Sequence, residues 1–174
     1  FENLQICELP IGDYAFTMTR QFLFDSYCRL IFGFLSSSDD ENRVLSGIAS
    51  KVVKESAFHL TRSSRWMSRL GKGTEESRER IDKALADLWG YTDEFFDYDE
   101  VDQEMVALGF CMEKDTLKDA WLNLVRKGLL EAELEIPESH WAARGGRCGV
   151  HTEHMGRLLA EMQVMQRRYP DLSW

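Results

Sequence analysis

Apolar side chains recur at steps of three and four residues along most of the chain, which is the spacing of amphipathic helices. Asp13 stands where a helix N-cap is expected, and the apolar steps after it predict a helix as far as Leu35. Arg167 and Arg168 suit the negative end of the last helix. In all, the pattern predicts helices over residues 13–35, 40–70, 75–96, 99–109, 115–134 and 152–168.

Signals for any other kind of structure are few. Prolines stand only at positions 10, 137 and 170, and Pro137 is expected to end the fifth helix. No Asn-Gly or Asp-Gly hairpin pair occurs, and residues 138–150 are predicted to be an irregular connection. Long helices joined by short turns are typical of antiparallel neighbours. The pattern therefore predicts an all-α fold, an up-down helical bundle.

The length of the chain is typical of one domain, so residues 1–174 are predicted to form a single helical domain. The chain opens with Phe1 rather than Met, and its first residues carry no capping signal. We therefore expect that an N-terminal piece of the bundle is missing from this sequence.

Charge and cysteine content narrow the function classes. The chain has 21 Lys and Arg against 30 Asp and Glu, a net charge of −9, which disfavours binding to nucleic acid or to an anionic membrane. No apolar run is long enough to cross a membrane, and no signal-peptide pattern is seen. The four cysteines lie far apart in the sequence, which argues against a zinc knuckle or a disulfide scaffold and favours a reducing cytoplasm.

The second helix contains a segment that resembles half of a di-metal site. Di-metal carboxylate bundles use Glu-x-x-His, because residues three apart project from one helical face into the core. Three positions before His59 the chain has Ser56, and Glu55 lies four positions before it. A serine hydroxyl is a poor ligand for iron or manganese. Nowhere does the sequence contain Glu-x-x-His.

Asp25 lies within an apolar stripe of the first helix and faces this segment. A buried carboxylate needs a partner or a metal. Two interpretations remain open: Asp25 pairs with His59 or with an arginine across the helix interface, or it belongs to a working di-metal centre.

Other candidate chemistry is weaker. His151 and His154 are three residues apart, unlike the four-residue spacing of zinc proteases, and we expect His151 or Thr152 to cap the last helix. No nucleophile elbow or phosphate-binding glycine loop occurs, and residues 145–149 are predicted to form a turn.

Two segments of single-sign charge stand out. Arg62, Arg65 and Arg69 share one face of the second helix, whereas residues 93–104 carry seven acids and no base. They are either two solvated faces, which can complement one another, or a docking surface for another subunit.

Four stretches of sequence then resemble a known family, the C subunits of the multicomponent phenylacetyl-CoA epoxidase. The similarity covers essentially the whole chain, and its most specific part is the segment after Gly149. The stretches are Glu8-Leu-Pro-Ile-Gly-Asp13, Arg20-Gln-Phe-Leu-Phe-Asp25, Lys54-Glu-Ser-Ala-Phe-His59 with Arg69-Leu-Gly-Lys-Gly-Thr74, and Gly149-Val-His-Thr-Glu-His-Met-Gly156 with Leu158-Leu-Ala-Glu-Met-Gln163.

This resemblance implies a ferritin-like fold with further N-terminal helices, and a cytoplasmic member of a monooxygenase complex of phenylacetate degradation. It implies that a related catalytic subunit holds the di-iron centre and binds the CoA thioester, while this chain pairs with it as a structural, non-catalytic partner. Asp25, Ser56 and His59 would then be vestiges of a metal site, and no cofactor is expected in this chain. Homo- and hetero-oligomers are expected. The alternative is an independent di-metal carboxylate oxidase or oxygenase.

Overall fold

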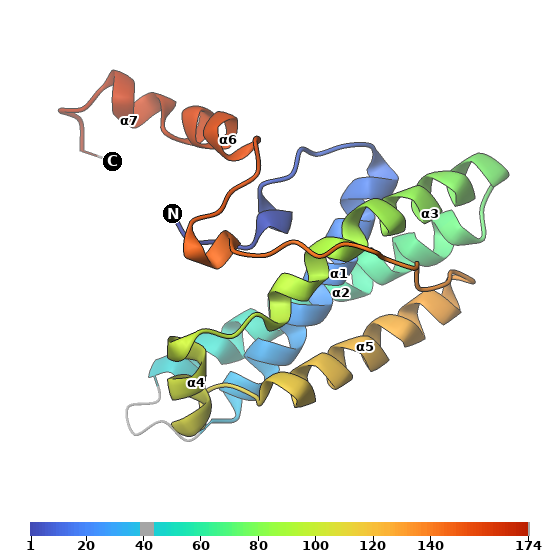
Figure 1. Cartoon of the computed structure of the whole chain (residues 1–174), viewed down its shortest axis with the longest axis horizontal. Helices are drawn as coiled ribbons and strands as arrows, with labels where there is room; N and C mark the ends of the chain where they lie inside the picture. The colour runs from blue at the N-terminus through green and yellow to red at the C-terminus, as the bar shows by residue number, and fades with distance from the viewer. Residues whose placement is uncertain (39–43, 174) are drawn as a thin grey trace.

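The computed structural model describes residues 1–38 and 44–173 of the chain, and within this part the regular structure is helical, with no strand. The helices are α1 Tyr14–Ser36, α2 Val44–Gly71, α3 Glu75–Trp89, α4 Glu100–Ala107, α5 Lys114–Glu131, α6 Met155–Met162 and α7 Val164–Arg168, with 3-10 turns η1 Gln5–Cys7, η2 Gly90–Phe96 and η3 Gly146–Cys148. Helices α1, α2, α3 and α5 form the bundle, α4 lies in the connection between η2 and α5, and the short helices α6 and α7 extend from the bundle towards the C-terminus (Figure 1). The predicted all-α class is confirmed.

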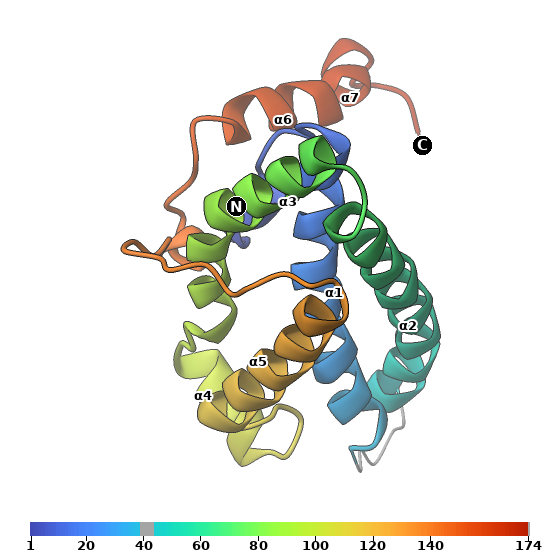
Figure 2. The ribbon, with the colours of Figure 1, turned by 90° about the vertical axis from the view of Figure 1, so that its right-hand side faces the viewer.

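Helices α1 and α2 form the longest interface of the molecule and run antiparallel (Figures 1 and 2). The start of α1 meets the end of α2, where the rings of Tyr14 and Trp66 pack edge to face. Asp13 caps α1 as predicted, since its carboxylate accepts a hydrogen bond from the backbone N–H of Phe16 at 2.8 Å.

The core lies where α1, α3 and α5 meet η2. Trp121 of α5 is 1% exposed, and its indole N–H donates to the carbonyl of Leu23 at 3.1 Å. It packs against three more rings from the segment that ends α3 and forms η2. Gly128 lets α5 approach α1 closely, because a Cβ there would lie 2.6 Å from the ring of Phe22. The three rings are those of Trp89, Phe95 and Phe96.

Three predicted boundaries need correction. The third helix ends at Trp89 instead of residue 96, because the chain tightens into η2 and thereby places Phe95 and Phe96 in the core. The fifth helix ends at Glu131 instead of Leu134, because the next turn passes through the left-handed region, with φ +58° at Glu133.

The predicted helix over 152–168 is in fact two helices, and the first begins at Met155. Thr152 is not helical because both its backbone N–H and its hydroxyl bind the carboxylate of Glu8. The second predicted helix agrees at its C-terminal end, while its predicted start, residues 40–43, lies outside the described residues.

Several apolar residues of α2 that the helical pattern placed on a buried face are exposed. They are Val44, Leu45, Ile48 and Phe58. None of the helices in the described ranges is both long enough and apolar enough to span a membrane.

Candidate functional site

Asp25 is buried between α1 and α2, at 4% exposure. Its carboxylate accepts one hydrogen bond from the Gln21 amide at 2.7 Å and one from the Ser63 hydroxyl at 3.1 Å. Burial raises the pKa of Asp25 above its ordinary value, because these two donors, together with the charges of His59 and Arg62, do not outweigh desolvation. The site is therefore poorly suited to an ionised carboxylate.

The partners of Asp25 differ from the expected ones. We expected His59 or an arginine to pair with it, but the two hydrogen bonds come from Gln21 and Ser63. His59 is exposed, and its ring packs edge to face on Phe58 with centroids 5.9 Å apart. Ser56 is buried and donates to the carbonyl of Val53 at 3.2 Å, within its own helix. Asp25 and Ser56 are thus inside the protein while His59 faces outward.

The three arginines of α2 form an exposed row along one face of the helix, as expected. Arg69 covers the ring of Trp66, with its guanidinium carbon 5.1 Å from the ring centroid. Throughout this article, the α2 outer face means the exposed residues Val44, Ile48, Phe58, Arg62, Arg65 and Arg69.

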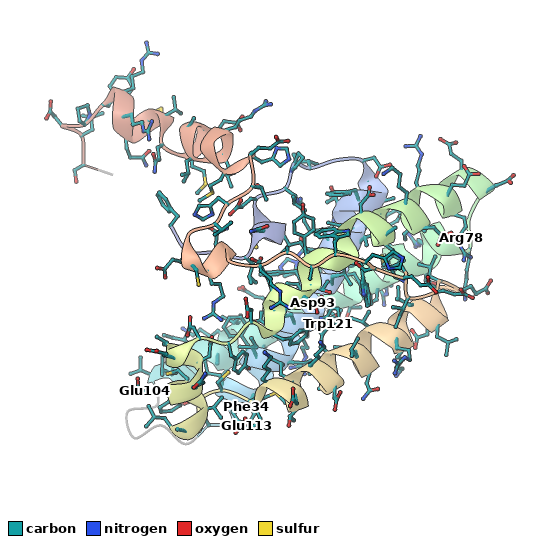
Figure 3. The ribbon with its side chains drawn as sticks, viewed as in Figure 1. Phe34, Arg78, Asp93, Glu104, Glu113 and Trp121 are labelled. Carbon is teal, nitrogen blue, oxygen red and sulfur yellow. The ribbon has the colours of Figure 1, made fainter. Side chains whose placement is uncertain are left out.

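Acids of the stretch 93–104 form ion pairs with cations outside α2. Arg147 forms ion pairs with Asp99 and Asp102, and Lys118 lies 3.7 Å from Asp93, which is labelled in Figure 3. Within the described residues, therefore, three of these acids pair with cations of α5 and η3, and none of the three pairs with an α2 arginine.

Two buried glutamates hold the N-terminal segment and residues 146–152 together. Glu8, 3% exposed, accepts hydrogen bonds from Asn3 at 2.9 Å, from the ring of His151 at 2.7 Å and from both donors of Thr152 at 2.7 and 2.8 Å. Burial acts to raise the pKa of Glu8, but the hydrogen bonds from His151, Thr152 and Asn3 outweigh it and hold the pKa below its ordinary value.

Glu94, at 1% exposure, makes the second connection. One carboxylate oxygen accepts from the backbone N–H of Gln5 and the other from that of Gly146, both at 2.7 Å. Residues 145–149 form the predicted turn, with left-handed glycines at both ends.

Comparison of this chain with known proteins identifies its family. The family model described as "Phenylacetic acid catabolic protein" matches residues 1–174. A curated relative, the C subunit of the 1,2-phenylacetyl-CoA epoxidase of Escherichia coli strain K12, is 39% identical over 174 residues, which are 100% of this chain and 69% of the relative. The chain belongs to the phenylacetic acid catabolic protein family. The resemblance drawn from the sequence is thus confirmed, as is the all-α, ferritin-like fold class.

The described residues can be compared with the groups that a di-metal centre draws on, the kind of centre that the resemblance places in the related catalytic subunit. Such centres draw on two Glu-x-x-His motifs and two further carboxylates. In residues 1–38 and 44–173 no group of three or more His, Cys, Asp or Glu side chains is arranged to hold a metal ion. Asp25, the buried acid described at the α1–α2 interface, has its hydrogen bonds satisfied by an amide and a hydroxyl.

Sequence reasoning missed the roles of Glu8 and Glu94. Both stand in segments that the sequence singled out, Glu8 in a stretch shared with the family and Glu94 among the acids of 93–104. Their partners lie 143 and 52 positions away, so no local pattern connects them. The joint presence of residues 8–13 and 149–156 in the resemblance was the available signal, and the structure brings these two segments into contact.

Proposed function

We propose that this chain is a non-catalytic structural subunit of a phenylacetyl-CoA epoxidase complex in phenylacetate degradation. In this proposal its single helical domain packs against the related catalytic subunit, which holds the di-iron centre. The chain itself contributes folded surface and no redox chemistry. Cysteines that are all free and widely spaced fit a cytoplasmic location for this complex.

The observation that carries the proposal is the environment of Asp25. An acid that binds iron offers its oxygens to the metal, whereas the two oxygens of Asp25 accept hydrogen bonds from Gln21 and Ser63. Ser56, in the place of a ligand glutamate, donates to its own helix. These contacts support a bundle that uses polar groups for packing at the position where the resemblance implies metal ligands in the related catalytic subunit.

The α2 outer face is the surface that we propose for the partner. It combines exposed apolar side chains with arginines, and arginine is enriched at protein interfaces while unpaired apolar surface on a monomer is not favoured. Permanent complexes commonly bury roughly 2,000 Å² or more. A helix as long as α2 can contribute a large share of such an area.

Co-expression with the catalytic subunit tests the proposal. We expect the two chains to purify together, and the catalytic subunit alone to be unstable or inactive. A catalytic subunit that is stable and fully active without this chain would contradict the proposal.

Charge reversal tests the proposed surface. Replacing Arg62, Arg65 and Arg69 together by Glu should abolish co-purification while leaving the helical circular dichroism unchanged, because all three are exposed. The control reverses three cations of α3 whose pairs are local or exposed, and it should leave co-purification intact. These control residues are Arg78, Arg80 and Lys83.

The second candidate is an independent di-metal oxidase or oxygenase. It predicts two equivalents of iron or manganese in each chain, lost on His59→Ala. Exposure of His59 disfavours it.

A further inference from the structure

The segment that leads out of the bundle towards α6 and α7 is fastened at both of its ends to the N-terminal segment. We name residues 144–152 the strap, and α6 with α7 the arm (Figure 1, orange to red). The side-chain amide of Gln5 donates to the carbonyls of Arg144 and Val150 at 3.1 Å each, and so spans most of the strap. Near the first end, Glu94 accepts from the backbone N–H of Gly146 at 2.7 Å. At the second end, the strap is held by Glu8.

The ring of His151 lies between two acceptors. Its Nδ1 is 2.7 Å from a carboxylate oxygen of Glu8, and its Nε2 is 2.9 Å from the backbone carbonyl of Phe1. A carbonyl has no proton to donate, and the pKa of Glu8 is held below its ordinary value, so near neutral pH its carboxylate has none either. Both ring nitrogens must therefore carry protons for both bonds to form, which makes the docked side chain an imidazolium.

Several other charged and titratable groups lie around Glu8 and His151, among them the α-amino group of Phe1, whose carbonyl binds the ring. Arg20 of α1 is a cation and donates to the carbonyl of Leu9 at 2.6 Å. Burial raises the pKa of Cys7 and that of Tyr91 of η2, so both stay neutral. Glu94 of η2 is occupied by two backbone donors. Just beyond the strap, His154 forms only an exposed 3.9 Å pair with Glu153.

We propose that His151 is a pH-sensitive latch: as an imidazolium it bridges Glu8 and the carbonyl of Phe1, and loss of one ring proton releases one bridge and loosens the strap that carries the arm. Histidine is the side chain that ordinarily changes charge between about pH 5 and 8. The strap is held by both bridges while the ring carries both protons and Glu8 is ionised. It loosens when either group changes its protonation state. This inference does not depend on the proposed function.

Nitrogen-15 NMR of the intact protein tests the protonation state directly, without any variant. At pH 6 the two ring nitrogens of His151 should both show the shifts of a protonated imidazolium, and on raising the pH one of them should move to the unprotonated position. A neutral ring at pH 6, with one nitrogen unprotonated in the folded protein, would overturn the proposal.

Hydrogen exchange measures the consequence for the strap. The backbone amide of Thr152 donates to Glu8 at 2.7 Å, and the amide of Gly146 reports on the other end of the strap. After correction for intrinsic exchange, protection of the Thr152 amide should fall about tenfold between pH 6 and pH 8, the size of effect expected for one charge-assisted hydrogen bond. Protection of the Gly146 amide should change less.

Two matched variants separate the latch from general pH effects. His151→Gln should lower protection at pH 6 and abolish its dependence on pH, whereas His154→Gln, three positions further along the chain, should keep the wild-type dependence. Unchanged protection across the pH range in the wild type would overturn the proposal, and so would loss of the dependence in His154→Gln alone.

Discussion

Asp25 and Glu8 are both buried carboxylates, and the protein shifts their pKa values in opposite directions. The carboxylate of Asp25 accepts two side-chain hydrogen bonds, and burial raises its pKa. The carboxylate of Glu8 accepts four hydrogen bonds, two of them from Thr152 and one from a histidine, and its pKa is lowered in spite of burial. The number and kind of donors therefore decide whether a buried acid stabilises the fold as an anion.

This difference bears on function. Glu8 is a structural anchor whose hydrogen bonds to His151 and Thr152 join the N-terminal segment to residues 151–152, so its burial has an explanation within the chain. Asp25 stands in the middle of a helix interface, and its hydrogen bonds come from an amide and a hydroxyl. This environment is the observation on which the proposal for a non-catalytic subunit rests.

The largest effect is expected at Glu8. Glu8→Leu leaves His151 and Thr152 without their acceptor in a buried site, and breaking such a pair costs about 3–5 kcal/mol of unfolding free energy. Urea denaturation at pH 7 measures the loss. Glu153→Leu, next to the strap, where the side chain is 89% exposed, should change stability by less than about 0.5 kcal/mol. Equal costs for the two variants would contradict the anchor role.

Glu94→Gln should have the next largest effect. Both oxygens of Glu94 accept backbone hydrogen bonds, whereas glutamine offers one acceptor and turns its amide towards the other N–H. We expect a loss of about 2 kcal/mol, the cost of one unsatisfied buried donor. Urea denaturation measures it. A neutral outcome would show that the strap relaxes and finds other partners.

Asp25→Leu should cost little or stabilise slightly, with a change of no more than about 1 kcal/mol, since buried charged groups often do no better than apolar replacements. Ser63 retains the carbonyl of His59 as an acceptor at 3.0 Å, and Gln21 is only half-buried. The same denaturation series checks it. A loss as large as that of Glu8→Leu would remove the contrast between the two sites.

The smallest effect is a pH dependence with opposite signs at the two sites. Because the pKa of Asp25 is raised in the folded state, its ionisation opposes folding at neutral pH, and Asp25→Asn should be slightly more stable than wild type at pH 7. This advantage should shrink as the pH falls through the folded-state pKa. The lowered pKa of Glu8 makes the wild-type protein lose stability on acidification, and Glu8→Gln should reduce that loss. Thermal melts between pH 4 and 7 compare the two variants.

Local signals predicted the bundle well. Asp13 caps α1, and Asp99 opens α4 with a capping box, as their residue types indicate. The prediction failed where contacts with a distant partner override the local pattern. Phe95 and Phe96 pack on Trp121, and the chain forms a 3-10 turn there instead of continuing α3. The backbone N–H of Thr152 binds Glu8, so the predicted helix does not begin at residue 152. The partners of Asp25 were not predicted because Ser63 lies on another helix and has no charge that would indicate a pairing with an acid.

Metal analysis tests the central claim most directly. The protein is purified with its catalytic partner, and iron and manganese are measured for the wild type and for Asp25→Leu and His59→Ala in this chain. We predict the same metal content in all three, with the iron belonging to the partner subunit. Two metal equivalents in each copy of this chain, lost in both variants, would contradict the account.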